Sequence, residues 1–443
     1  MPLPPYYPDT PVIRKHWAHY FDLVTAMDTW AGRMLAELEE DGLAENTIVF
    51  YFSDHGVGLP RAKRWMYDCG IQIPLMVRWP GEISGGLVKD DLVSFVDFAP
   101  TVLALAGVEP PDHMQGQILL GDDAAPPRKY IHAARDRMDE RYDIIRAIRD
   151  KRFKYIRNYE PYRPYDQYLS YPESFPVMQE MRFMERTGQL QGSETLFFQD
   201  RKPLEELYDM SVDPHETQNL AYLEGYDDTL RRVRRAMNDW VLETHDLGLV
   251  PEMLLDQWRP PNAPPATDSP EYAMPVGGAA HQKIAGREAI AWLLDLRGSN
   301  PFVRLQGIKM LSNGGQPYEP ILRAVLTDPE PAVAHWAAIG LGHLDEITQE
   351  SLAALEAALN HESVAVYLAA ARALLLHGPH DEALKTAIAG LEHENKHARV
   401  HAVETLEMVD VEIPGVREAL ERAVKDDYDY VKRIADHALK KAS

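Results

Sequence analysis

The chain has 443 residues, 45% of them hydrophobic, so it is long enough for two or three domains and too apolar to be disordered throughout. Its 46 Lys and Arg residues against 69 Asp and Glu residues give a formal charge of -23, which argues against a nucleic-acid partner. The single cysteine, Cys69, excludes an internal disulfide and a zinc site built from cysteines. No stretch reaches the roughly 20 apolar residues of a membrane span, so we expect none.

The first part of the chain alternates helical and strand-like segments. Apolar residues recur at helical spacing over residues 11–40, and residues 100–106 form a second helical segment. The runs 46–52 and 73–79 are short, continuous and apolar, the pattern of strands buried on both faces of a parallel sheet. This order predicts an α/β layer fold for residues 1–128.

The next segment, residues 129–258, has shorter strand candidates. They lie at 129–133, 144–148 and 153–156, and the spacing of the last two is that of a hairpin. We therefore expect a small antiparallel sheet. The Tyr- and Pro-rich segment 159–171 predicts an ordered surface loop, which could also line a cleft.

A change in composition marks the C-terminal part of the chain. Six prolines between residues 259 and 280 predict a linker. In residues 281–443, helical segments repeat with a small residue roughly every 30 to 33 positions, as in helical solenoids. The small residues are Gly307, Ala337, Ala369, Ala402 and Ala435. This predicts an all-α HEAT-like solenoid, whose surface could also bind a protein partner.

Candidate chemistry is concentrated in the loop that follows the first predicted strand. Asp54 and His55 come directly after it, at the carboxyl end, where ligands bind in open α/β sheets. A carboxylate beside an imidazole suits a divalent cation, and Lys63 and Arg64 supply positive charge for an anionic substrate. On spacing alone, a strand-terminating turn and a solvated cation pair explain these residues about as well.

Several short motifs follow one another in order over roughly residues 1–250. They are Asn46-Thr47-Ile48-Val49, Ser53-Asp54-His55-Gly56, Lys63-Arg64-Trp65, Tyr67-Asp68-x-Gly70, Ile73-Pro74-Leu75, Val96-Asp97-Phe98-Ala99-Pro100-Thr101, Tyr155-Ile156-Arg157-Asn158-Tyr159, Glu206-Leu207-Tyr208-Asp209 and Asn219-Leu220. The series resembles the later part of the formylglycine-dependent type I sulfatases, which belong to the alkaline phosphatase superfamily. Residues 1–128 would then be the C-terminal part of the α/β alkaline-phosphatase-like catalytic domain, and 129–258 the sulfatase C-terminal subdomain with its small antiparallel sheet.

The resemblance implies roles for individual residues. Asp54 and His55 match the pair that helps to hold a calcium ion, and Lys63 matches the lysine that contacts the sulfate group. Because imidazole is a poor ligand for calcium, His55 could instead bind the sulfate, or the site could take another divalent metal. We therefore assign Lys63 and His55 to catalysis, and Asp54 and His55 to the metal.

Substrate binding is the other role that the resemblance suggests. A sulfated small molecule or carbohydrate is the expected substrate. Its candidate ligands are Lys63, Arg64, Arg137, Asp139 and Arg141. Arginines in such a cluster can bind a sulfated sugar bidentately, although a solvated network of salt bridges explains the cluster nearly as well.

One departure from the family concerns the nucleophile. The family's Cys-x-Pro-x-Arg motif is absent, because Cys69 is followed by Gly-Ile-Gln-Ile, and no Ser-x-Pro-x-Arg replaces it. We therefore expect hydrolysis of sulfate esters only when a nucleophile region completes the site, and no turnover by the chain alone. If Met1 is the true start, a cytoplasmic location is expected; with a longer N-terminus, a periplasmic or secreted one.

Two other functions stay open at this point. A metal-dependent phosphodiesterase of the same superfamily would use the same fold and metal pair. Alternatively, the chain is a non-catalytic binding or scaffold protein that uses the concave surface of its HEAT-like solenoid.

Overall fold

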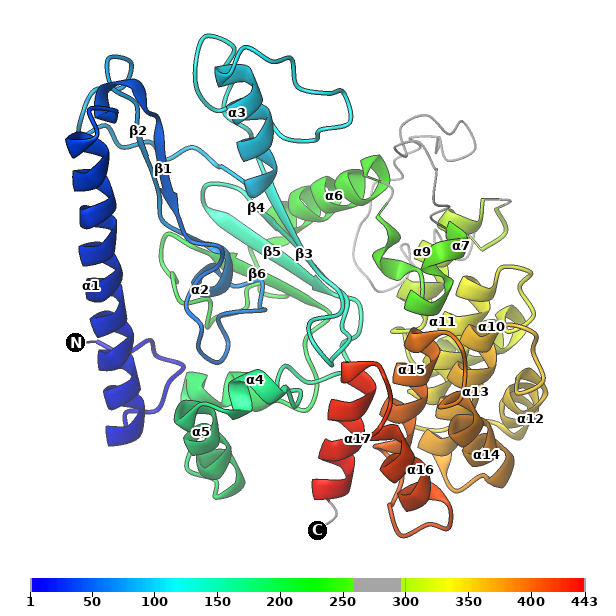
Figure 1. Ribbon diagram of the computed structural model, residues 1–443. Coiled ribbons are helices and arrows are strands. Elements are labelled where there is room, and N and C mark those ends of the chain that lie inside the picture. Colours follow the sequence, from blue (N-terminus) through cyan, green and yellow to red (C-terminus); the bar gives the residue numbers. More distant parts are fainter. Residues whose placement is uncertain (1, 245, 259–295, 299, 442–443) are drawn as a thin grey trace. The chain divides into compact units, whose positions relative to one another are not determined.

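The computed structural model of the chain describes residues 2–244, 246–258, 296–298 and 300–441. The predicted linker, 259–280, lies outside these residues. The chain forms two compact units (Figure 1). Unit 1 comprises Met1–Arg135, Ile145–Asn158 and Arg163–Val233, and unit 2 comprises Asp136–Ile144, Tyr159–Tyr162 and Arg234–Ser443. Two short segments, Asp136–Ile144 and Tyr159–Tyr162, group with the helical C-terminal part, and the predicted domain boundaries stay predictions.

The helices and strands of unit 1 include the predicted ones in the predicted order. They are α1 (Pro11–Glu40), β1 (Val49–Phe52), α2 (Asp68–Ile71), β2 (Leu75–Arg78), α3 (Phe98–Leu105), β3 (Ile131–Arg135), β4 (Ile145–Arg149), β5 (Phe153–Asn158), α4 (Ser170–Glu173), α5 (Pro176–Arg186) and β6 (Glu205–Asp209). The structure adds α2, α4, α5 and β6 to the predicted elements. Helix α6 (Asp227–Glu243) begins in unit 1 and ends in unit 2. Short 3-10 turns connect several of these elements, among them Ala44–Asn46, Phe95–Asp97 and Gly192–Phe198.

The long N-terminal helix begins where the sequence predicts. The Thr10 hydroxyl accepts a hydrogen bond from the Ile13 amide over 3.3 Å, and Pro11 occupies the first turn. The helix ends at Glu40 with Asp41 as its C-cap, and Gly42 follows with a φ of 71°, a left-handed conformation that glycine adopts without strain.

The first two strands pair differently from the prediction. β1 and β2 are antiparallel, with Val49 opposite Arg78 and Phe52 opposite Leu75, so the expected parallel pairing is wrong. They are also not buried on both faces, since the side chain of Met76 is 58% exposed. A continuous apolar run indicates a strand but carries no information about the direction of its neighbour, which explains the error.

The predicted small antiparallel sheet is confirmed. β3, β4, β5 and β6 lie side by side in that order, each antiparallel to the next. One face of this sheet carries a core of mostly aromatic and aliphatic side chains. The core consists of Trp65, Met66, Tyr67, Ile145, Ala147, Ile156, Tyr165, Met178, Phe197 and Tyr208. The loop after β1 therefore packs on this sheet through residues 65–67.

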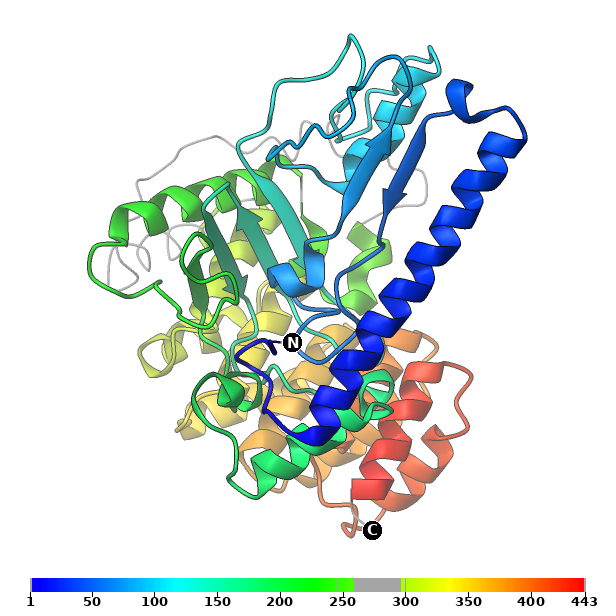
Figure 2. The ribbon, with the colours of Figure 1, turned by 90° about the vertical axis from the view of Figure 1, so that its left-hand side faces the viewer.

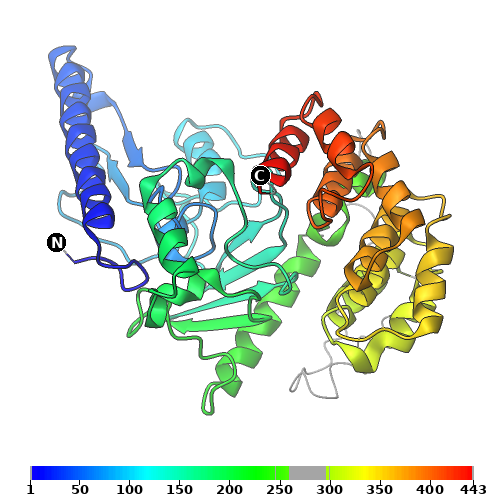
Figure 3. The ribbon, with the colours of Figure 1, turned by 90° about the horizontal axis from the view of Figure 1, so that it is seen from below.

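Unit 2 is a stack of helices, which confirms the predicted all-α solenoid (Figure 3). Its elements are α7 (Leu255–Trp258), α9 (Pro301–Leu311), α10 (Glu319–Val325), α11 (Pro331–Gly342), α12 (Gln349–Ala358), α13 (Val364–His377), α14 (Asp381–Gly390), α15 (Lys396–Leu406), α16 (Val416–Ala423) and α17 (Asp429–Lys441), with 3-10 turns at Leu247–Leu249, Glu252–Leu254 and Gln316–Tyr318. The repeated small residues are all buried, and they let neighbouring helices approach closely.

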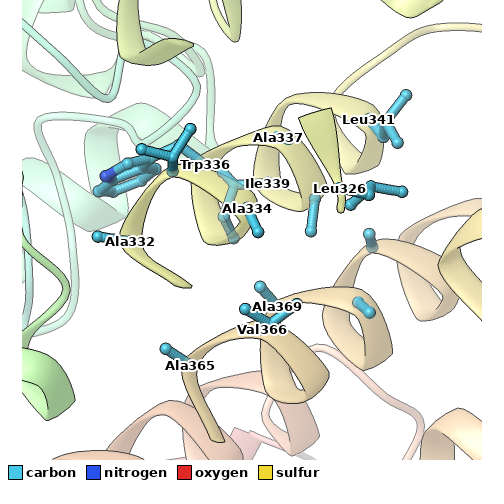
Figure 4. Packing of buried hydrophobic residues seen from close by; sticks show 14 of the residues in the cluster. Leu326, Ala332, Ala334, Trp336, Ala337, Ile339, Leu341, Ala365, Val366 and Ala369 are labelled. Atoms are coloured by element: carbon cyan, nitrogen blue, oxygen red, sulfur yellow. The ribbon is translucent and has the colours of Figure 1, made fainter. Parts of the chain in front are cut away.

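Helices α11 and α13 form the centre of the unit 2 core (Figure 4). Ala334 and Ala337 of α11 lie near Val366 and Ala369 of α13, and all four side chains are at most 3% exposed. The close contact continues at Gly342, where a Cβ atom would lie 2.8 Å from the Ala373 Cα atom. Within the part of the chain that the structure describes, no helix is long and apolar enough to cross a membrane.

Candidate functional site

The loop after β1 is held in place by backbone contacts to α2. The Gly56 amide donates to the Gly70 carbonyl over 2.9 Å, and the Val57 amide donates to the Cys69 carbonyl over 3.0 Å. A Cβ atom at Gly56 would lie 2.0 Å from the Cys69 carbonyl oxygen, so only glycine allows this approach. The loop therefore has a defined path, and Asp54 and His55 lie directly before its anchored part.

The predicted metal pair is partly solvent-exposed. The Asp54 Oδ1 and His55 Nε2 atoms lie 3.7 Å apart, and the side chains are 86% and 33% exposed. The His55 Nδ1 atom lies 2.7 Å from the Gly56 carbonyl oxygen, a contact that favours a proton on Nδ1. In that tautomer, the Nε2 lone pair and the Asp54 carboxylate are both available to a ligand.

These two residues do not make a calcium site by themselves. Calcium takes six to eight oxygen ligands, whereas the pair offers one carboxylate and one imidazole. Among residues 2–244, 246–258, 296–298 and 300–441, no group of three or more His, Cys, Asp or Glu side chains could hold a metal ion. Calcium at Asp54 and His55 therefore stays a prediction.

Lys63 and Arg64 meet over one aromatic ring. The Lys63 Nζ atom and the Arg64 Cζ atom each lie 4.7 Å from the centre of the Tyr171 ring. Arg64 has a φ of 78°, an uncommon conformation for a residue other than glycine. Its carbonyl oxygen accepts a hydrogen bond from Arg135 over 3.3 Å. The tertiary structure thus holds two adjacent cations beside the same tyrosine.

These cations border a pocket of unit 1. The pocket has a volume of about 400 Å³, which includes open solvent. Its lining is Gly58, Leu59, Pro60, Arg61, Lys63, Arg64, Trp65, Tyr165, Asp166, Gln167, Leu169, Tyr171, Pro172, Met178 and Phe197. Burial raises the pKa of Asp166 to about 6, although Arg182 acts in the opposite direction. With Lys63 and Arg64 at its border, the pocket combines an aromatic lining with positive charge.

Residue-by-residue analysis of the sequence missed Tyr171, Tyr165 and Asp166 as pocket residues. Their only signal was the density of Tyr and Pro in the segment 159–171, which predicts an ordered loop that could line a cleft. The structure shows that the end of this loop does line the pocket, next to Lys63 and Arg64.

The predicted arginine cluster lies in unit 2 and is engaged there. The Arg137 guanidinium pairs with Glu252, with Nη2 2.7 Å from Oε2, and both side chains are 8% exposed. Arg141 binds both carboxylate oxygens of Glu407, over 2.5 and 2.6 Å. Asp139 lies in the turn between these two arginines with a φ of 53°. Substrate binding by Arg137, Asp139 and Arg141 stays a prediction, and the observed ion pairs favour a structural role for the two arginines.

The Glu407 ion pair makes the stability of unit 2 sensitive to acid. Burial raises the pKa of Glu407, but hydrogen bonds from Arg141 and His437 outweigh it and lower the pKa to about 2, from an ordinary value of 4.5. A carboxyl with a lowered pKa stabilises the folded state above its unfolded pKa. That stabilisation is lost as the pH falls from about 4.5 to about 2.

We therefore expect Glu407→Gln to lower the free energy of unfolding by about 2 to 3 kcal/mol at pH 7 and by much less near pH 2.5. Urea unfolding followed by circular dichroism at pH 7, 4.5 and 2.5 measures this difference. A matched control is Glu382→Gln, because Glu382 forms an exposed pair with Lys385. Equal losses for Glu407→Gln at all three pH values would contradict the prediction.

Comparisons with known protein families give three matches along the chain. Residues 4–108 match the sulfatase family, and residues 61–170 match the C-terminal domain of N-sulphoglucosamine sulphohydrolase. Residues 288–375 and 352–440 match HEAT repeats. The sulfatase matches include the loop after β1 and the pocket residues up to 170, whereas Tyr171 and three further pocket residues lie beyond them.

Individual relatives agree with these matches. An ulvan-active sulfatase from Formosa agariphila is 40% identical over 277 residues, which cover 62% of this chain and 46% of the relative. The human N-sulphoglucosamine sulphohydrolase is 29% identical over 281 residues, 59% of this chain and 55% of that protein. An N-acetylglucosamine-6-O-sulfatase from Bacteroides thetaiotaomicron is 30% identical over 214 residues, 47% of this chain and 32% of that protein.

The chain spans about half the length of the curated relatives it matches. The expected fold class was a partial α/β alkaline-phosphatase-like region, a small antiparallel subdomain and an all-α HEAT-like solenoid. The structure contains the small antiparallel sheet and the stacked helices, and the first of the three expected regions matches the sulfatase family over residues 4–108. Residues 4–170 of this chain are thus similar to sulfatases, and residues 288–440 are similar to HEAT repeats.

Proposed function

We propose that this chain contributes to the hydrolysis of sulfate esters, with a sulfated carbohydrate as the substrate class. The observation that carries the proposal is the pair of cations, Lys63 and Arg64, beside Tyr171 at an aromatic-lined pocket. Two relatives have names that specify aminosugars, N-sulphoglucosamine and N-acetylglucosamine, which supports a carbohydrate substrate.

The proposed chemistry follows from the charge of the substrate. Hydrolysis of a sulfate ester breaks a sulfur–oxygen bond, and negative charge develops on the oxygens of the transferring group and on the departing oxygen. An ammonium at Lys63 and a guanidinium at Arg64 would attract the ester and stabilise that charge, because both are already held in place before the substrate binds. The Tyr171 ring lines the pocket and is 41% exposed, so it offers apolar surface to a sugar ring.

Asp54 and His55 are proposed to bind a metal ion. They would supply two ligands to a divalent cation, calcium first, and further ligands would come from a region that this sequence does not contain. The same region would carry the nucleophile, since the chain has neither Cys-x-Pro-x-Arg nor Ser-x-Pro-x-Arg. A bound cation would add positive charge near the sulfate.

The proposal is tested with the chain alone and with the chain joined to any open reading frame directly upstream. Each form is assayed with an aryl sulfate and an aryl phosphate, with calcium and after chelation. We expect sulfate release by the joined form only, and loss of that release on chelation. Turnover of the phosphate ester instead would indicate a phosphodiesterase, and partner capture without turnover in either form would indicate a binding protein.

A further inference from the structure

A fully buried lysine lies against the loop that carries Lys63. Lys154 of β5 is 0% exposed, and groups from the loop, from α2 and from the turn at residue 216 surround its Nζ atom. The Nζ atom donates to the Met66 carbonyl oxygen over 3.0 Å, lies 2.8 Å from the Glu216 Oε1 atom and pairs with the Asp68 carboxylate. These three partners match the three hydrogens of an ammonium, so they offset the cost of burying its charge.

Glu216 holds the same loop at two more points. Its Oε2 atom accepts a hydrogen bond from the Asp68 amide over 2.6 Å, and its backbone carbonyl accepts one from the Arg61 Nη2 atom over 2.5 Å. The Arg61 guanidinium lies 4.4 Å from the centre of the Tyr6 ring, and Arg61 is only 2% exposed. The loop is therefore anchored to buried groups both before and after Lys63.

The backbone between these anchored points is tightly packed. The Lys63 amide donates to the Val57 carbonyl oxygen over 3.0 Å. A Cβ atom at Gly70 would lie 2.1 Å from the Ala62 carbonyl oxygen and 2.6 Å from the Trp65 carbonyl oxygen. The loop thus packs directly on α2, which lies next to the sheet formed by β3 to β6 (Figures 1 and 2). Because the packing leaves little space, a shift at the anchored points would move Lys63 as well.

We propose that Lys154 and Glu216 are positioning residues for Lys63. With Asp68 they form a network, the buried anchor, which fixes the loop so that the Lys63 ammonium stays at the pocket beside Tyr171. A buried network whose charges are all partnered rigidifies its surroundings, and charged hydrogen bonds also fix the direction of approach. The anchoring depends only on the observed contacts, whereas its role in turnover rests on the proposed function.

The test removes the charge of the buried anchor without leaving it unbalanced. Lys154→Met alone would leave two buried carboxylates next to each other, so the double variant Lys154→Met, Glu216→Gln is used. Asp68 then keeps its ion pair with Arg149, in which the Oδ2 and Nη2 atoms lie 3.2 Å apart. Circular dichroism checks that the double variant is folded.

Hydrogen exchange of the full chain measures the anchoring itself. We expect amide exchange at residues 57–70 to be roughly tenfold or more faster in the double variant than in the native chain. Exchange in β4, at Ile145–Arg149, should stay within about twofold, since the sheet does not depend on the loop. The matched control is Lys151→Met, Asp91→Asn, which removes a surface pair that spans 3.6 Å and should change neither segment.

Steady-state kinetics of the joined form measure the role in turnover. With an aryl sulfate, the double variant should lower kcat by roughly tenfold or more, with a smaller change in KM, because a misplaced ammonium no longer meets the transition state. Lys63→Met should then cost less in the double variant than in the native background, since the charge that it removes is already out of place. A merely structural role predicts independent losses that multiply.

The outcomes separate this inference from the proposed function. Unchanged exchange at residues 57–70, or kinetic losses that multiply with those of Lys63→Met, overturns the inference and leaves the function intact. Faster exchange at these residues, together with no sulfate release by the joined form of the native chain, supports the anchoring and contradicts the function. If the double variant does not fold, Glu216→Gln alone, which keeps Lys154 paired with Asp68, gives the same readouts on a smaller scale.

Discussion

Replacement of Arg137 by methionine is expected to lower the free energy of unfolding by about 3 to 5 kcal/mol, the usual cost of removing one partner of a buried ion pair. The Arg137 guanidinium contacts both carboxylate oxygens of Glu252, over 2.7 to 2.9 Å, and lies 3.7 Å from Glu404. Burial raises the pKa of Glu252, and Arg137 and His401 outweigh it and lower that pKa. In the Arg137→Met variant, the buried Glu252 carboxylate therefore loses its closest cation.

Urea unfolding followed by circular dichroism measures the effect of Arg137→Met. A matched control is Arg235→Met, because the Arg235 side chain is 81% exposed and its pair with Asp239 spans 3.9 Å. Its effect should stay within about 0.5 kcal/mol. The double variant Arg137→Met, Glu252→Met should recover most of the lost stability, since no buried charge is then left unbalanced.

The same variant tests the substrate-binding interpretation of Arg137. If Arg137 binds sulfated sugar, its replacement raises the KM of the completed enzyme and leaves the stability nearly unchanged. If Arg137 holds the segment 136–144 against the helices of unit 2, stability falls and the double variant restores it. The second result is the one that we expect.

Replacement of Lys63 by methionine is expected to lower the kcat of the completed enzyme by roughly 10²- to 10³-fold. The ammonium lies beside the Tyr171 ring at the pocket, so the positive charge is held in place before the substrate binds. Because the charge on the sulfate oxygens grows toward the transition state, we expect a larger effect on kcat than on KM.

The matched control is Lys151→Met, which removes a lysine of unit 1 that is 59% exposed and pairs with Asp91. It should leave kcat unchanged within about twofold, since an exposed pair contributes little. Steady-state assays of both variants with an aryl sulfate provide the comparison. A Lys63→Met enzyme with an unaltered kcat would remove Lys63 from the catalytic machinery and leave it as a solvated surface cation.

Local patterns in the sequence predicted the secondary structure well. The N-terminal helix, the strands near 131, 145 and 153, and the solenoid helices are found where the spacing of apolar residues places them. The helix and the hairpin depend on interactions within a few residues, namely the hydrogen bonds of the first helical turn and the turn between neighbouring strands. The solenoid was predicted from small residues that repeat along the chain. Strand β6 was missed, because its residues Glu205–Asp209 are largely polar and are buried only through contacts to distant partners.

The candidate site was predicted only in part. Its motif placed Asp54, His55, Lys63 and Arg64 on one loop, and the structure keeps them there. Tyr171 lies more than 100 residues further along the chain, and nothing local indicates that it meets Lys63. Contacts of this kind depend on how the segments pack against each other, which apolar spacing does not encode.

By itself, the sequence indicated the similarity to sulfatases, the order of the main elements and the charged residues that are candidates for binding a sulfate ester, because each of these depends on motifs or on the spacing of residues along the chain. Only the tertiary structure decided the antiparallel pairing of β1 and β2, the meeting of two cations at Tyr171, and the burial of Arg137 and Arg141 against Glu252 and Glu407. The physical reason is that pairing direction and ion-pair partners depend on contacts between residues far apart in the sequence. Which of these contacts form is set by the free energy of the whole folded unit.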